Sequence, residues 1–386
     1  MTNERINWEE LQSQTFYWIR FPFIVMVVFN HSPGIIAIPD AVNVCDPLSL
    51  SSVDYWNLLR MAFTSVLSRM AVPGFFLMSG YLFFYKIQDW NKSVYAKKLK
   101  NRFYSILIPY VSWNTICLVT PIVMLSILGL KNHIYSEALD RYWGEVDWLR
   151  WIWDGISSKD GAYNWLGIWH CETYPINYPL WFMRDLMVLC ILTPVIYWLI
   201  KKVKLYYIII LSLLFLLDIW PNIHGFSSMG MLFFSVGAYL SINKLNMLMI
   251  FRKVEIPCYL LTIVLVCVLI PTNFNCTLGI IKLAYCFRIL GAVSAFNIAS
   301  RLLQKKIVTT NKWLSDRYFF IYVFHAIYFV IFCTELVFPF STDRSITYRF
   351  IEYLLTPFVK IIICLIVYEV MRKTMPRVLG ILLGKR

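Results

Sequence analysis

Hydrophobic runs of about twenty residues recur along this 386-residue chain, and each is long enough to cross a hydrocarbon core roughly 30 Å thick. In total, 59% of the residues are hydrophobic and only 15% are charged. A water-soluble fold of this length cannot bury so much apolar surface. The sequence therefore predicts an all-α membrane protein, a polytopic bundle of about ten transmembrane helices that forms one domain over residues 1–386. The expected spans are 16–37, 61–85, 103–129, 178–200, 205–220, 227–242, 256–270, 278–299, 318–338 and 352–371.

Positive charge is concentrated on one side of these spans. The connecting segments on that side, together with Arg5 and the basic tail 372–386, carry 23 of the 36 Lys and Arg residues, whereas the segments on the other side carry six. By the positive-inside rule, we expect a multi-pass protein of the cytoplasmic (inner) membrane with both termini in the cytoplasm and an even number of spans. Topology thus accounts for the net charge of +14, and nucleic acid is not an expected partner.

Basic residues also occur within or at the edges of the spans. Placing a charge at mid-bilayer costs roughly 2.5 to 3.5 kcal/mol on insertion scales, so these side chains are expected to face a wet cavity or a partner. Snorkelling to the interface is the alternative, and it applies best to Arg60 and Arg184. The seven residues are Arg20, Arg60, Arg69, Arg184, Lys282, Arg288 and Lys360.

The segment 131–177 is the only long one expected on the extracytoplasmic side, and it is rich in tryptophan. These rings could stack on the sugars of an acceptor, but they more often lie in the headgroup belt, on a short helix along the membrane. His133 and His170 in this segment are expected to have no catalytic role. Three cysteines would face outward, and the sequence leaves open whether two of them form a disulfide: Cys45, Cys171 and Cys276. No Cys or His cluster has metal-ligand spacing, so no metal is expected.

In the first expected span, Arg20 and His31 are separated by ten residues. Eleven steps of 100° come to about 20° past three full turns, so both side chains would point the same way, roughly 16 Å apart along the helix axis. One helix face would then carry a cation toward the cytoplasm and an imidazole toward the outer leaflet. A lone His in a membrane helix is often only hydrogen-bonded to a neighbour, which is the alternative for His31.

The second span contains Arg69, followed by a proline and by small residues that permit close helix packing. A basic run then leads into the third span. Lys98 and Arg102 in this run are four residues apart and so share one helix face. Such a cluster suits a phosphorylated ligand, although topology signalling alone explains it equally well. The four cations of the cluster are Lys97, Lys98, Lys100 and Arg102.

Five segments, in this order and over essentially the whole chain, resemble the acyltransferase-3 family of membrane-bound O-acyltransferases. They are the Arg20-to-His31 spacing, RMAVPGFFLMSGYLFF in the second span, the basic run ending in ILIPY, YPLWFMRDL at the start of the fourth span and YFFIYVFHAIYFV in the ninth. The resemblance is to the membrane module alone, without the esterase-like domain that many members carry.

The resemblance implies transfer of an acyl group, commonly acetyl, from cytoplasmic acyl-CoA as co-substrate to a hydroxyl of a glycan or lipid-linked sugar. It implies that His31 is catalytic and that Arg20 is essential, with no permanently bound cofactor. We therefore expect Arg20 and His31 to line one open conduit through which the pantetheine arm brings the thioester to His31. An Arg, two residues, Arg motif in the family is thought to hold the CoA phosphates. Arg102 matches its first position, but Ser105 occupies the second and cannot supply a charge. Lys98, one turn earlier, could replace it.

A neutral His31 could take the proton of the acceptor hydroxyl as general base, because the unperturbed pKa of histidine, about 6.5, leaves the ring largely neutral. An acyl-histidine intermediate is equally compatible with the sequence. Arg69 is the first candidate to stabilise the oxyanion, and Arg288 is the second. We expect further side chains to line the cavity, with His325 as a structural member rather than a second base: His325, Arg288, Ser79, Trp181 and Arg184.

The main competing function is that of a transporter or flippase for a glycan or small anionic solute, because buried charges within many spans also describe secondary carriers. Carriers often show inverted repeats and broken helices in both halves, and neither is clear here. A non-catalytic scaffold is a third hypothesis, under which a change at His31 would alter no chemistry. The outer segments do not distinguish among glycan acceptors, and the motifs leave the oligomeric state open.

Overall fold

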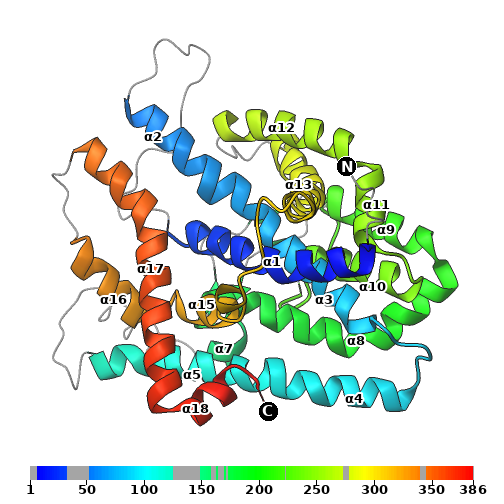
Figure 1. Cartoon of the computed structure of the whole chain (residues 1–386), viewed down its shortest axis with the longest axis horizontal. Helices are drawn as coiled ribbons and strands as arrows, with labels where there is room; N and C mark the ends of the chain where they lie inside the picture. The colour runs from blue at the N-terminus through cyan, green and yellow to red at the C-terminus, as the bar shows by residue number, and fades with distance from the viewer. Residues whose placement is uncertain are drawn as a thin grey trace.

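Apolar α-helices make up most of the computed structural model (Figure 1). The part of the chain that it describes comprises residues 7–32, 52–124, 148–157, 162–163, 169–170, 173–221, 223–272, 278–339 and 345–385. Six of its helices are long and apolar enough to cross a membrane, and two further pairs of bent helices bring the number of candidate spans to eight. The protein is therefore a multi-pass membrane protein, while ten spans and cytoplasmic termini stay predictions.

The helices occupy the expected spans with shifted ends. The first half comprises α1 (Trp8–Asn30), α2 (Ser52–Arg60), the π-helix η2 (Met61–Val66), the 3-10 helix η3 (Leu67–Met70), α3 (Ala71–Phe84), α4 (Lys92–Arg102), the π-helix η4 (Phe103–Leu107), α5 (Ile108–Ile122), α7 (Trp148–Trp153) and η6 (Tyr178–Leu180). The second half comprises α8 (Trp181–Val203), α9 (Leu205–Leu216), α10 (Ser228–Ile242), α11 (Met247–Lys253), α12 (Glu255–Thr272), α13 (Leu278–Gln304), α14 (Lys312–Ser315), α15 (Tyr318–Phe324), α16 (Tyr328–Val337), α17 (Ile346–Thr374) and α18 (Pro376–Leu382).

Helix α1 begins eight residues before the expected start at residue 16. The Asn7 side chain caps it by accepting a hydrogen bond from the Glu10 backbone N–H at 3.2 Å. The first two turns are polar, so hydropathy alone missed them. The helix ends at Asn30, with His31 as its C-cap, while the last five residues of the expected span, 33–37, lie outside the described residues.

The expected span 318–338 is one of the two candidate spans made of bent helix pairs, because α15 and α16 meet at 89°. The segment contains neither Gly nor Pro, so no residue of the kind that usually breaks a helix predicts this bend. His325 supplies the physical reason. Its Nδ1 donates to the carbonyl oxygens of Ile321 at 3.0 Å and Tyr322 at 2.8 Å, and the Tyr322 carbonyl is the acceptor that the next turn of helix would need.

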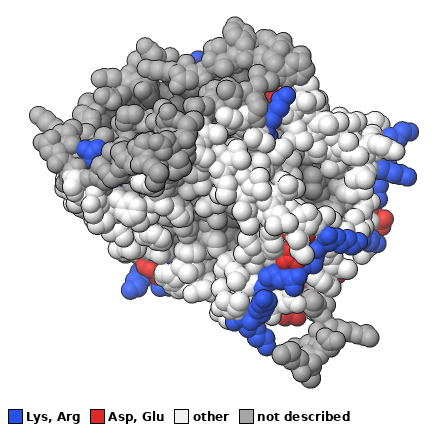
Figure 2. Space-filling view, turned by 90° about the horizontal axis from the view of Figure 1, so that it is seen from above, with Lys and Arg blue, Asp and Glu red and all other residues white. Residues whose placement is uncertain are grey.

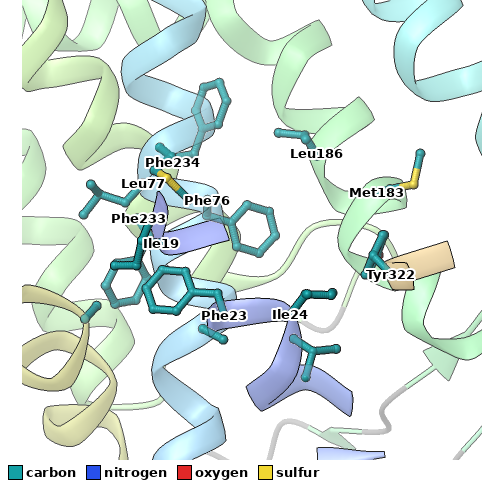
Figure 3. Close-up of a cluster of buried hydrophobic side chains, with 14 of the residues drawn as sticks. Ile19, Phe23, Ile24, Phe76, Leu77, Met183, Leu186, Phe233, Phe234 and Tyr322 are labelled. Carbon is teal, nitrogen blue, oxygen red and sulfur yellow. The ribbon is translucent and has the colours of Figure 1, made fainter. Parts of the chain in front are cut away.

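Helix α1 runs through the middle of the bundle and contacts α3, α13, α15 and α17 (Figure 1). Its buried side chains meet those of α3, α8 and α10 in an apolar core (Figure 3). Helices α3 and α10 approach each other most closely where glycines lie. A Cβ at Gly80 would overlap the carbonyl oxygen of Phe234, and one at Gly237 would overlap the carbonyl oxygen of Leu77.

The outside of the bundle carries many exposed apolar side chains, such as Ile256, Leu260 and Ile263 along α12. An apolar outer surface is what a helix needs in order to face lipid. Figure 2 shows a face that is largely uncharged, with Lys and Arg mainly toward its edges.

Part of the tryptophan-rich segment folds against the bundle. Helix α7 packs on α5, where the Tyr110 hydroxyl donates to the Ile152 carbonyl oxygen. Antiparallel ladders pair β1 (Ile156–Ser157) with β4 (Thr173–Tyr174) and β2 (Ala162–Tyr163) with β3 (Trp169–His170). Cys45, Cys171 and Cys276 lie outside the described residues, as does His133.

Candidate active site

A cavity of about 570 Å³ opens at the C-terminal end of α1. Its volume is in the range of sites that bind small molecules. Side chains from α1, η3, α3, α8, α13 and the α9–α10 loop line it, so segments far apart in the sequence converge here. The charged or titratable lining residues are His31, Arg69, Tyr174, Tyr178, Arg184, Asp185, Asp218, His224, Tyr285 and Arg288.

His31 lies in this cavity because the end of α1 is anchored from two sides. Its backbone N–H donates to the Val27 carbonyl oxygen at 3.1 Å, and its own carbonyl oxygen accepts a hydrogen bond from Lys360 Nζ at 2.9 Å. The imidazole meets the Tyr178 ring edge-on, with centroids 4.7 Å apart. The ring is partly exposed and lines the cavity at the end of α1.

His325 does not line the cavity, contrary to expectation. It is completely buried and stacks on His31, with ring centroids 5.5 Å apart and an interplanar angle of 27°. Nδ1 bonds to the backbone carbonyls at the α15–α16 break, and Nε2 has no hydrogen-bond partner among the described residues. The ring therefore supports His31 from behind rather than facing the cavity.

Two guanidinium groups predicted to serve the reaction, those of Arg69 and Arg288, line the cavity with His31. Arg69 lies on the short η3 segment and is exposed to the open space. Arg288, on α13, lies over the Tyr285 ring at 5.1 Å from its centroid. Both cations thus contribute positive charge to the wall of the cavity.

Arg184 and Trp181 also line the cavity as expected, but Arg184 is buried and tightly held. Its Nε and Nη2 each lie 3.2 Å from Asp185 Oδ1, and its Nη1 donates to the Trp153 carbonyl oxygen at 2.7 Å. Burial rules out the snorkelling alternative, and pairing with Asp185 makes Arg184 a structural cation that ties α8 to the tryptophan-rich segment. Ser79, about two turns further along α3 than the cavity residue Val72, does not line the cavity.

Arg20 does not reach the cavity either. It lies on α1 with its guanidinium over the Tyr318 ring, 5.3 Å from the centroid. Between Arg20 and His31, α1 contributes Phe23 and Ile24 to the packed core, where Phe76 and Met183 are also buried (Figure 3). The expectation that one open conduit joins Arg20 to His31 is therefore not met by this cavity, because core side chains occupy the intervening layer.

The predicted acyl-CoA cluster lies at the other end of α3. The side chains of Lys98 and Arg102 both lie over the Phe83 ring, at 5.8 and 5.7 Å from its centroid, so they share a face as expected. Lys97 and Lys100 are exposed on the same helix. Phe83 is eleven residues beyond the cavity residue Val72, which is about 16 Å along α3. The basic cluster and the cavity thus lie toward opposite ends of this span.

The C-terminal tail packs beside the position where the basic motif lacks its second arginine. Gly384, at φ 64°, lies so close to the backbone of Ser105 that an added Cβ would overlap it. Trp113 Nε1 donates to the Leu382 carbonyl oxygen at 2.9 Å and holds the tail there. In this structure, the tail backbone fills space next to residue 105.

One group of interacting residues in the cavity wall could not be predicted from the sequence. His224 lines the cavity, and its Nδ1 lies 3.0 Å from Oδ2 of Asp154, whose Oδ1 accepts a hydrogen bond from Arg150 Nε at 3.2 Å. These residues lie on two loops and on α7, separated by about seventy positions of sequence. No spacing rule connects them, so only the fold could show the pair. Among the described residues, no group of His, Cys, Asp and Glu could hold a metal ion.

The chain is similar to known proteins. A family model described as an acyltransferase domain, Acyl_transf_3, matches residues 16–369. The chain is also similar to the succinoglycan biosynthesis protein ExoH of Rhizobium meliloti (strain 1021), with 24% identity over 335 residues that cover 85% of this chain and 82% of that protein. No solved structure matches it. The family match takes in α1, the cavity and the basic cluster, so the chain belongs to the acyltransferase-3 family and is a membrane acyltransferase.

Proposed function

We propose that this protein transfers an acyl group, most simply acetyl, from cytoplasmic acyl-CoA to a hydroxyl of a cell-surface glycan or lipid-linked sugar. One observation carries the proposal, namely that the His31 imidazole and two guanidinium groups share one cavity at the C-terminal end of α1. Family membership supports acyl transfer, and the relative named for succinoglycan biosynthesis supports a polysaccharide acceptor. The distribution of Lys and Arg supports an inner-membrane protein with both termini in the cytoplasm.

The donor would bind with its phosphates at Arg102 and Lys98, with Lys97 and Lys100 adding to the positive field. A phosphate group carries too much charge to enter hydrocarbon, whereas the pantetheine arm is long and mostly neutral. Because the cavity lies about 16 Å further along α3, the arm must pass the layer that contains Phe76 and Met183. Donor binding therefore requires these side chains to move, and Arg20 borders that route from α1.

In the cavity, the acyl carbonyl would meet His31. The ring either takes the proton of the acceptor hydroxyl as it attacks the thioester, or first accepts the acyl group itself. In both routes the carbonyl oxygen becomes negative, and Arg69 and Arg288 supply positive charge to it. The carbon–sulfur bond then breaks, the departing thiolate takes up the proton from the His31 ring, and CoA thiol leaves on the cytoplasmic side.

The test uses the purified full chain in lipid nanodiscs with labelled acetyl-CoA and de-acylated succinoglycan oligosaccharides. We expect label on the sugar with the wild-type protein and none with His31→Ala, while the variant keeps the same elution volume and melting temperature within a few degrees. Full transfer by a correctly folded His31→Ala protein would overturn the catalytic assignment. Movement of unmodified oligosaccharide across the membrane without labelling would identify a carrier instead.

A further inference from the structure

The Asp154–His224 pair is prepared for proton transfer. A carboxylate can only accept hydrogen bonds, so the 3.0 Å contact assigns the ring proton to Nδ1 of His224 and leaves Nε2 as the basic nitrogen. Arg150 binds the other carboxylate oxygen and keeps the anion in place. The His224 side chain is 35% exposed, whereas Asp154 is 16% exposed. This is the arrangement by which an acid orients a histidine general base.

The two cavity histidines differ in their surroundings. His31 contacts the rings of Tyr178 and His325 and has no carboxylate within ion-pair distance among the described residues. The contact with Asp154 holds the His224 ring in one orientation, and His31 lacks such a contact among the described residues. A neutral imidazole in such a site is better suited to attack a thioester as a nucleophile than to hold a proton.

We propose that the reaction uses both rings: His31 accepts the acyl group, and His224, positioned by Asp154, is the general base for the acceptor hydroxyl. This inference rests on the proposed function and chooses one of its two routes. His224 comes from the α9–α10 loop and Asp154 from the loop after α7, so the base would approach from the loops that border the cavity. The acceptor would enter between the loops and α1.

The steps balance as two half-reactions. First, the unprotonated nitrogen of His31 attacks the thioester carbonyl, the carbon–sulfur bond breaks, and the departing thiolate takes up the ring proton to give CoA thiol and acyl-His31. Second, the acceptor oxygen attacks the acyl carbon while its proton passes to His224 Nε2. The carbon–nitrogen bond then breaks, and His31 recovers the proton that His224 received. Asp154 takes part in no bond that forms or breaks and acts only by keeping the His224 ring in position.

The two half-reactions can be measured separately. Exchange of labelled CoA into acetyl-CoA without acceptor reports acyl-His31 formation, whereas label on de-acylated succinoglycan oligosaccharides reports the whole reaction. For His224→Ala we expect exchange within twofold of wild type and transfer reduced about a hundredfold or more, the usual size of a lost general base. Free imidazole should restore transfer at least tenfold, because it fits the space that the side chain vacated.

Matched variants separate catalysis from folding. His224→Asn fills the space, so imidazole should not rescue it, and Asp154→Asn should lose about tenfold in transfer with exchange kept. His31→Ala should lose both activities. The inference is overturned if His224→Ala transfers like wild type, if it loses exchange and transfer equally, or if wild-type protein that transfers acyl groups shows no exchange. A wild-type protein that labels no sugar would overturn the proposed function itself.

Discussion

Lys360 Nζ donates a hydrogen bond to the backbone carbonyl oxygen of His31 at 2.9 Å, joining the middle of α17 to the C-terminal end of α1. Carbonyl groups at a helix end have no partner within the helix, and the partial negative charge there favours a cation. Lys360 was expected from the sequence only to face a wet cavity or a partner, and the partner is the backbone of the proposed catalytic residue. The contact fixes the end of α1 and thus the position from which the His31 imidazole projects.

Replacing Lys360 by Met should therefore impair turnover more than donor binding. Methionine keeps the length of the side chain but donates no hydrogen bond, so the end of α1 loses its anchor and His31 takes up several orientations. We expect kcat for acyl transfer to fall about tenfold, in line with the loss of one charged hydrogen bond, with KM for acyl-CoA within about twofold of wild type. Lys360→Arg should recover part of kcat. Equal kcat in Lys360→Met and wild type would show that the contact does not position His31.

Removing Arg102 should weaken the use of acyl-CoA. In Arg102→Ala, Lys98 is the one of the two cations that still lies over the Phe83 ring. We therefore expect KM for acyl-CoA to rise about tenfold. The kcat should change little, because the cavity lies toward the other end of α3. Lys92→Ala, an exposed lysine in the first turn of the same helix, is the matched control and should leave KM unchanged. An equal effect of both changes would mean that net charge alone, rather than this face, attracts the donor.

Periodicity and charge predicted the parts of the site that lie on regular helices. The four-residue spacing of Lys98 and Arg102 predicts a shared face, and the structure confirms it because α4 is an unbroken helix there. His31 and Arg69 were singled out as intramembrane polar residues, and both line the cavity. On a regular helix the direction of a side chain follows from its position in the sequence alone, so these residues could be placed without the structure.

The parts that failed depend on contacts between distant segments. His325 breaks its own span through side-chain hydrogen bonds to the backbone, and nothing in the apolar run around it predicts that break. Asp154 and His224 lie on separate loops, where the chain has no period to extrapolate. Arg20 was expected to border an open conduit, but Phe23 packs directly against Gly74 of α3 beside it. Composition does not predict how closely two such residues pack.

The close contact of α3 with α10 should make small residues there irreplaceable. In Gly80→Ala and Gly237→Ala the new methyl group meets backbone carbonyl oxygen, which cannot rotate away as a side chain can, so the two helices must separate. We expect each change to cost about 1 to 3 kcal/mol of stability, the usual range for overpacking. Gly380→Ala is the control, because an added Cβ there meets nothing within 4 Å. Thermal unfolding in detergent measures the difference, and equal melting temperatures for all three variants would contradict the packing argument.

The buried pair of Arg184 and Asp185 should show its importance when only one partner is removed. Arg184→Met leaves the carboxylate of Asp185 buried at 1% exposure with one backbone donor, the N–H of Ser227 at 3.3 Å, so we expect a loss of about 3 to 5 kcal/mol. Asp185→Asn keeps an acceptor for that N–H but leaves the guanidinium without its anion.

The double variant Arg184→Met/Asp185→Asn separates charge from packing, because it removes both ions and keeps similar volumes. We expect it to be more stable than Arg184→Met alone, with a coupling energy of about 1 to 3 kcal/mol in a double-mutant cycle measured by unfolding in detergent. Arg184 also donates a hydrogen bond to the Trp153 carbonyl oxygen, which the double variant loses. We therefore expect the tryptophan-rich segment to open more often in the double variant and to be cleaved faster around α7 than in wild type. Additive single effects would mean that the two charges are stabilised independently, each by its backbone contacts.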